Sequence, residues 1–167
     1  MSLNLEYIGY ETAKVLSKIK EEEVSAYLDA INSKSNYYLE HSVAPSIYNV
    51  VLEIALVESI WKLQELHGSK EAMENNVLML VHGEQKMTFT RLLKIGEEIS
   101  SFASVENIQQ KGSNNILRLK TSHFDSSNNE IGNSYWTLFI RASESEINKS
   151  KDANKSEKPK KALKPKV

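Results

Sequence analysis

The segment from 44 to 66, APSIYNVVLEIALVESIWKLQEL, constrains the fold more than any other part of the chain. Its aliphatic and aromatic side chains recur at three- and four-residue steps and also fill most of the remaining helical surface. Pro45 suits the first turn of a helix, and Gly68 suits a left-handed exit. The pattern predicts one long helix from Ala44 to Leu66. Because that helix is apolar nearly all round, we expect it to lie in a core.

After this segment the hydrophobic period changes to that of β-strands. Four stretches are rich in β-branched and aromatic residues, at 77–91, 98–108, 115–124 and 131–141. The connections between them are short and rich in turn formers, which predicts that consecutive strands are antiparallel neighbours. The chain is therefore predicted to be α+β, with a four-stranded antiparallel meander that covers the long helix.

The part of the chain before the long helix carries weaker patterns. A short strand is expected near 14–19 and a helix at 20–31, where three glutamates favour a helix N-terminus. The polar run at 32–38, NSKSNYY, is expected to be a loop. After the long helix, the polar patch at 69–76 is compatible with a turn of helix or a loop.

Length and composition predict one folded domain followed by a tail. With 167 residues and 40% hydrophobic content, the chain can bury a core of its own, and we expect a single domain over 1–142. The stretch 149–167 carries eight lysines against Asp152 and Glu157. A tail of this composition cannot bury enough apolar surface to offset the cost of ordering, so 143–167 is predicted to be disordered and basic. It lacks interleaved aromatic residues, so no nucleic-acid binding is expected.

Several function classes are excluded by composition. The chain has no cysteine, and its four histidines are scattered without a metal-ligand spacing, so neither a metal nor a cofactor is predicted. Glu53, Glu58 and Lys62 interrupt the most apolar stretch, so no membrane span is predicted. The N-terminus lacks a basic start followed by an apolar run, and a cytoplasmic protein is expected.

One run of motifs resembles a known family. The motifs are a histidine-glycine stretch, an arginine and a glycine-acid turn downstream, and an Ala-Pro-small turn at the start of the long helix: His82, Gly83, Arg91, Gly96, Glu97, Ala44, Pro45 and Ser46. In this order they resemble the MaoC-like dehydratases, particularly the FAS1-like dehydratase domains. The resemblance covers roughly residues 10–141.

This resemblance implies a hot-dog fold, in which a curved antiparallel sheet wraps around one long central helix. It also implies acyl thioester ligands, carried by coenzyme A or acyl carrier protein, and (R)-specific hydration or dehydration in at least a dimer. The substrate-binding residues that it implies are Ala44, Pro45, Ser46, His82 and Gly83.

The acid–base pair of the family is missing from the expected loop. That chemistry needs a carboxylate to orient a water molecule and a histidine to exchange its proton. Where the family has a Gly-Asp-x-Asn-Pro-x-His loop, this chain has 32–38, with Ser33 at the aspartate position and Tyr38 at the histidine position. The chain is more similar to the non-catalytic halves of heteromeric hydroxyacyl-carrier-protein dehydratases.

Two other side chains are candidates for chemistry. His41 lies near the altered loop and could replace the missing base, although a lone loop histidine is more often a solvated or capping residue. Glu53 on the long helix could act in thioester hydrolysis, although a carboxylate on a polar helix edge beside Asn49 is the simpler interpretation. His67 is expected to cap the helix C-terminus and His123 to be structural.

Three hypotheses follow. The first is a catalytically silent subunit that shapes the acyl tunnel of an active MaoC-like partner in a heterodimer. The second is a homodimeric hot-dog acyl-CoA thioesterase that uses Glu53, or a hydratase that uses His41. The third is a non-enzymatic module that binds an acyl ligand.

Overall fold

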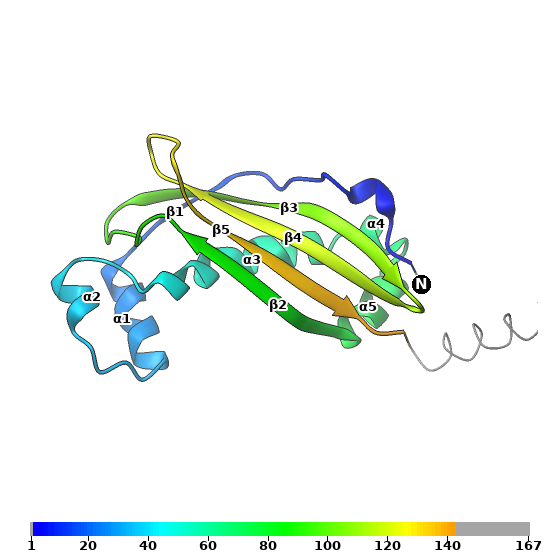
Figure 1. Ribbon diagram of the computed structural model, residues 1–167, viewed down its shortest axis with the longest axis horizontal. Helices are drawn as coiled ribbons and strands as arrows, with labels where there is room; N and C mark the ends of the chain where they lie inside the picture. Colours follow the sequence, from blue (N-terminus) through cyan, green and yellow to red (C-terminus); the bar gives the residue numbers. More distant parts are fainter. Residues whose placement is uncertain (1, 143–167) are drawn as a thin grey trace, which may run out of the picture.

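The computed structural model describes residues 2–142. A five-stranded antiparallel sheet curves around a central helix, and the helices α3, α4 and α5 lie on one side of it (Figure 1). The strands are β1 (Val15–Lys18), β2 (Leu80–Phe89), β3 (Glu98–Lys111), β4 (Asn114–Phe124) and β5 (Glu130–Ile140). The helices are α1 (Glu21–Ala30), α2 (Tyr37–Glu40), α3 (Asn49–Trp61), α4 (Gln64–His67) and α5 (Lys70–Leu78), with 3-10 turns at Leu5–Tyr7 and Ser46–Tyr48. This is the α+β hot-dog architecture that the sequence predicted. The tail predicted at 143–167 lies outside the described residues.

The strand order is β1-β3-β4-β5-β2, so the predicted four-stranded meander is only partly confirmed. Strands β3, β4 and β5 follow one another as predicted, but β2 pairs with β5 instead of β3. The prediction assumed that the short connection from Thr90 to Glu97 joins neighbouring strands. Eight extended residues, however, reach about 26 Å. That reach exceeds the roughly 14 Å that separates strands three places apart in a sheet.

The long helix predicted from Ala44 to Leu66 is divided into shorter elements. A 3-10 turn precedes α3, and α3 ends at Trp61. The left-handed Gly68 closes the short helix α4 instead, and the patch at 69–76 belongs to α5, which Ser69 caps by accepting the backbone N–H of Ala72. The strand expected from residue 77 therefore begins only at Leu80.

The central helix is buried on one side only. Its inner face packs into the main core against the sheet through Leu56 and Ile60. The outer side chains of Val51 and Ile54 are 45% and 54% exposed, and Ile47 in the 3-10 turn before the helix is 51% exposed. The expectation that the helix is covered all round is therefore wrong for a single copy of the chain.

A second core cluster fixes α1 and α2 beyond one end of the sheet, where Figure 1 shows both helices projecting. Val24 and Leu28 of α1 are buried there together with Tyr48. Among residues 2–142, no helix is long and apolar enough to span a membrane.

Candidate functional site

The start of α3 is held by the connection between β2 and β3. The backbone N–H of Ala44 donates to the carbonyl of Leu93 at 2.9 Å, and the N–H of Ile95 donates to the carbonyl of Ser42 at 2.8 Å. The predicted Ala-Pro-Ser turn thus leads into the helix through a buried Ala44 and Pro45 and a half-buried Ser46. Because Ala44 already has an acceptor and proline has no N–H, neither residue can offer a backbone donor to a ligand.

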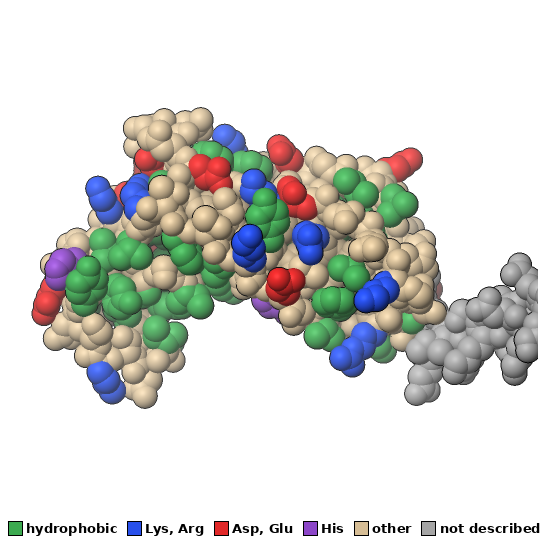
Figure 2. Space-filling model, viewed as in Figure 1, with side chains coloured by type: hydrophobic (Ala, Val, Ile, Leu, Met, Phe, Trp, Pro, Cys, Tyr) green, Lys and Arg blue, Asp and Glu red, His purple; other side chains and the backbone are tan. Residues whose placement is uncertain are grey.

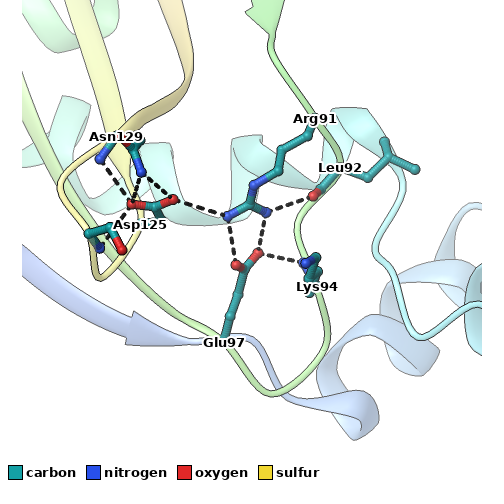
Figure 3. Close-up of polar contacts among 7 residues, drawn as sticks. Arg91, Leu92, Lys94, Glu97, Asp125 and Asn129 are labelled. Carbon is teal, nitrogen blue, oxygen red and sulfur yellow. Dashed lines mark hydrogen bonds and ion pairs between the residues drawn. The ribbon is translucent and has the colours of Figure 1, made fainter.

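An arginine-carboxylate pair supports that connection (Figure 3). Two guanidinium nitrogens of Arg91 donate to the two oxygens of Glu97 at 2.9 and 2.8 Å, and Nη1 of Arg91 also donates to the Leu92 carbonyl. The carboxylate of Glu97 in turn accepts the backbone N–H of Lys94. The hydrogen bonds with Glu97 raise the pKa of Arg91. Arg91 and Glu97, the arginine and acid of the motif, therefore stabilise the connection between β2 and β3. This connection hydrogen-bonds to the segment that leads into α3.

A second carboxylate lies beside this pair. Oδ2 of Asp125 lies 3.8 Å from Nη2 of Arg91. The hydrogen bond from the backbone N–H of Asn129 makes the largest contribution to lowering the pKa of Asp125. Other hydrogen bonds and the charge of Arg91 lower it further. The ion pair between Asp125 and Arg91 therefore links the turn between β4 and β5 to the connection between β2 and β3.

The altered loop contains no acid–base pair. Ser33 donates its backbone N–H to the carbonyl of Leu28, and its hydroxyl accepts the N–H of Ser35 at 3.4 Å. Tyr38 is half-buried and packs on the second core cluster, in a turn of helix where the sequence predicted a loop. Among residues 2–142, no carboxylate or imidazole hydrogen-bonds to either side chain.

His41 caps the short helix α2. Its Nδ1–H donates to the carbonyl of Tyr37 at 2.9 Å, and its ring stacks on the Tyr37 ring with centroids 4.2 Å apart. The imidazole is exposed, and within the described part of the chain no carboxylate hydrogen-bonds to it. These contacts with Tyr37 orient the ring and leave the other nitrogen, Nε2, as the one that remains for chemistry.

Glu53 is fully buried, so the expectation of a polar helix edge is wrong. Its Oε1 accepts from Nε2 of His123 at 3.0 Å and from the hydroxyl of Ser134 at 2.5 Å. Its Oε2 accepts from Nε1 of Trp136 at 2.8 Å and from the amide of Gln85 at 3.1 Å. Four donors from three strands, β2, β4 and β5, thus converge on one carboxylate of α3.

These donors decide the charge of Glu53. Burial raises the pKa of the carboxyl, but the hydrogen bonds from His123, Ser134 and Trp136, together with the charge of His123, outweigh it and hold the pKa of Glu53 below its ordinary value. The group is an ionised anchor between the central helix and the sheet. The sequence offered one signal for it, a glutamate among apolar residues of a core helix, and no signal for its donors.

Two buried histidines, His67 and His123, have structural roles. Nδ1 of His123 lies 2.8 Å from the hydroxyl of Ser101, which gives a serine, histidine and glutamate in series, but all three are buried. His67 donates from Nε2 to the carbonyl of Trp61 at 2.8 Å and so caps α3, as predicted. Burial lowers the pKa of His67, so the cap is a neutral imidazole and not the cation that was expected.

The predicted substrate-binding residues do not gather in one place. His82 and Gly83 lie at the start of β2, beside the C-terminal half of α3, whereas Ala44 and Ser46 lie at the N-terminal end of α3 (Figure 1). The ring of His82 stacks on Trp136 with centroids 4.7 Å apart.

Two hollows flank the central helix. The larger, of about 570 Å³, runs between α3 and the N-terminal segment with β1, and apolar side chains such as Val51, Ala55 and Leu56 line it. The smaller, of about 270 Å³, lies between α3 and β2, and His82 and Trp136 line it. Among residues 2–142, no three histidine, aspartate or glutamate side chains are grouped to hold a metal ion.

Comparison with known proteins gives the family and the fold. The family model described as FAS1-like, dehydratase domain region matches residues 6–133. No curated protein matches the sequence.

Solved structures with the same fold are similar at low sequence identity. The truncated HadBC (3R-hydroxyacyl-ACP dehydratase) complex from Mycobacterium tuberculosis has a TM-score of 0.64 at 12% identity, over 80% of this chain and 96% of that chain. The (R)-hydratase from A. caviae, involved in PHA biosynthesis, has a TM-score of 0.58 at 13% identity, over 78% and 94%. The ChsH1-ChsH2 complex from Mycobacterium tuberculosis has a TM-score of 0.58 at 13% identity, over 81% and 91%.

Proposed function

This chain belongs to the family of FAS1-like dehydratase domain regions, and from that membership we propose that it binds an acyl thioester as a subunit of an (R)-specific dehydratase or hydratase without performing the acid–base step itself. The thioester would be carried by coenzyme A or acyl carrier protein. A cytoplasmic location is compatible with the absence of cysteine.

The observation that carries this proposal is the absence of an accessible carboxylate–histidine pair in residues 2–142. Hydration of an enoyl thioester needs both groups on one water molecule. Ser33 and Tyr38 stand in their place and have other structural contacts. The pair formed by Glu53 and His123 is fully buried, so no water or substrate can approach it from the surface.

The larger hollow beside α3 supports acyl binding. Its volume of about 570 Å³ is within the range of small-molecule pockets, and its walls are mainly apolar. Lys18 and Glu23 are its charged lining residues. An alkyl chain lying along Val51, Ala55 and Leu63 would be removed from water, which is the main favourable contribution to binding such a ligand.

The thioester head group would lie at the N-terminal end of α3. Since Ala44 and Pro45 cannot donate, the backbone N–H groups that remain for a carbonyl oxygen there are those of Ser46 and Ile47. Donors placed in this way stabilise a polarised carbonyl. They hold the acyl group but transfer no proton.

The partner in this proposal is an active subunit of the same fold. The HadBC and ChsH1-ChsH2 structures are complexes of two different chains, which supports an assembly of this kind. If no active subunit exists, the non-enzymatic acyl-binding module is the alternative.

The geometry gives less support to the enzymatic alternatives. A nucleophile or base must reach the substrate, but Glu53 is fully buried and both of its oxygens accept hydrogen bonds from the sheet. His41 is accessible but has no carboxylate partner in residues 2–142.

The test is hydration of crotonyl-coenzyme A by the purified chain, alone and with a candidate active subunit. We expect no turnover by the chain alone, and turnover by the pair that exceeds that of the active subunit. Turnover by the chain alone that His41→Ala abolishes would instead establish the His41 hydratase.

A further inference from the structure

A polar hollow lies on the face of the sheet that points away from α3. Five residues of β2, β4 and β5 line a space of about 390 Å³: Glu84, Lys86, Arg118, Tyr135 and Thr137. Trp136 and Leu138 of β5 belong to the core cluster beside the central helix, so Tyr135 and Thr137, which alternate with them, point to the opposite face. The sheet therefore separates this hollow from the two hollows that flank α3.

The hollow follows from the side chains that the strand register places next to one another. Thr137 of β5 is paired with Glu84 of β2 on one side and with Arg118 of β4 on the other. In the next row, Tyr135 is paired with Lys86. Neighbouring strands are about 4.8 Å apart, so the long side chains of β2 and β4 start about 10 Å from each other, across the short Thr137. This spacing leaves room for a group of the size of a phosphate above the threonine.

The charged groups around the hollow are not used by the fold. Glu84, Lys86 and Arg118 are exposed, and none of them forms an ion pair within residues 2–142. Lys120 lies beside them, with its Nζ 5.8 Å from the centre of the Tyr135 ring. Figure 2 shows charged side chains of both signs on this face. Because three cations surround the hollow and only one carboxylate lines it, the local field favours an anion.

The donors at the hollow suit a phosphate group. Arg118 has a planar fork of N–H groups that can bind two phosphate oxygens at once, and Lys86 adds a flexible ammonium group. The hydroxyl groups of Thr137 and Tyr135 can donate further hydrogen bonds. A phosphate monoester has three acceptor oxygens, so it can meet donors on both sides of the hollow and at its floor.

Glu84 restricts the rest of the ligand. Its carboxylate repels a bare divalent anion, but it accepts hydrogen bonds from hydroxyl groups. A ligand therefore fits the whole hollow if it carries hydroxyl groups beside its phosphate. The volume of about 390 Å³ is within the range of small-molecule pockets.

We propose that this hollow binds the phosphate monoester of a small polyol or sugar. The phosphate lies between Lys86 and Arg118, above Thr137, and a hydroxyl group of the ligand donates to Glu84. The site is on the opposite face of the sheet from α3, so the proposal does not rest on acyl binding.

The test is a titration of the full ¹⁵N-labelled chain with inorganic phosphate, glycerol 3-phosphate and O-phosphoethanolamine, followed by ¹H–¹⁵N spectra. The ionic strength is held constant, because salt screens exposed charges whatever the anion. We expect saturable shifts of the Tyr135 and Thr137 amide signals, and the tightest binding for glycerol 3-phosphate.

Three variants locate the ligand. Arg118→Gln should weaken the binding of all three ligands at least about fivefold, because the paired hydrogen bonds and their charge are lost. Glu84→Gln should bind inorganic phosphate about threefold more tightly and should lose the preference for glycerol 3-phosphate. Lys111→Gln, at the far end of β3, is the control and should leave the affinities unchanged.

Three results would overturn the proposal. One is the absence of saturable shifts at constant ionic strength. Another is equal affinity of Arg118→Gln and the unmodified chain, because the phosphate would then lie elsewhere. The third is tighter binding of O-phosphoethanolamine than of glycerol 3-phosphate, because Glu84 would then select an ammonium group. The substituted side chains are exposed, and unshifted core signals in each variant verify that it is folded.

Discussion

Nε2 of His123 lies 3.0 Å from Oε1 of Glu53, and neither side chain is exposed. With Ser134, Trp136 and Gln85 as the other donors, this contact joins the central helix to three strands of the sheet. A charge in the core is tolerated only where such donors replace water. The anchor fixes the position of α3, which forms a wall of both hollows.

Removal of this anchor should destabilise the fold strongly. Glu53→Ala leaves three buried donors and the half-buried amide of Gln85 without an acceptor, and we expect a loss of about 3–5 kcal/mol in the free energy of unfolding. Chemical denaturation measures it. Glu58→Ala, which removes a surface ion pair with Lys62, is the control and should cost less than about 1 kcal/mol. Equal losses for the two variants would contradict the role given to Glu53.

The same anchor predicts a loss of stability in acid. The pKa of Glu53 is lowered in the fold, so the unfolded chain binds the proton more tightly. Its stabilisation is present above the ordinary pKa of about 4.5 and is lost as the pH falls through the lower folded pKa. The denaturation midpoint should fall with pH in this window more steeply for the unmodified chain than for Glu53→Gln. Parallel curves would show that another group is responsible.

His67 should produce a separate effect at higher pH. Burial lowers its pKa below 6.5, so the neutral ring stabilises the fold above about pH 6.5, and stability declines as the pH falls and the unfolded chain takes up the proton. His67→Gln should remove this decline below about pH 6.5. His41→Gln, at an exposed cap, is the control and should retain it. A decline that survives in His67→Gln would show that another histidine is responsible.

The two tryptophans should differ in their indole N–H resonances. Trp136 donates to the Glu53 carboxylate, whereas Nε1 of Trp61 is buried and has no hydrogen-bond partner among the residues that the structure describes. In a ¹H–¹⁵N spectrum we expect one indole proton well downfield of the other, because a charge-assisted hydrogen bond deshields its proton. Glu53→Gln should move the downfield signal and leave the other in place. Two signals with similar shifts in the unmodified chain would contradict the bonded and unbonded assignment.

The paired guanidinium at the β2–β3 connection should not tolerate lysine. Arg91→Lys loses the two parallel bonds to Glu97, and we expect a cost of about 1–2 kcal/mol in the free energy of unfolding. Arg118→Lys, at an exposed position without an ion pair in the described chain, is the matched control and should stay within about 0.5 kcal/mol. Similar costs at both positions would remove the support role of Arg91.

The sequence predicted the elements better than their arrangement. Hydrophobic periodicity placed the central helix and the strands β3, β4 and β5, because one-sided burial leaves a pattern within each element. The position of β2 beside β5 depends on contacts between distant segments, and no local pattern records them. The break after Trp61 depends on a cap by His67 that forms only in the folded chain.

The candidate site was predicted in the same uneven way. The loss of the acid–base pair could be seen directly from Ser33 and Tyr38, because it depends on residue type alone. The burial of Glu53 could not, since a glutamate on a helix is normally solvated and its donors come from strands 32 to 83 residues away in sequence.

The most direct test of the central claim is calorimetric titration of the purified chain with a non-hydrolysable thioether analogue of a medium-chain acyl-coenzyme A. Ala55→Trp fills the larger hollow, and Ile54→Trp on the other flank of α3 is the control. The unmodified chain and Ile54→Trp should bind the analogue, and Ala55→Trp should bind it at least tenfold more weakly. Absence of binding by the unmodified chain, or equal binding by all three proteins, would contradict the proposal that this chain holds an acyl group beside its central helix.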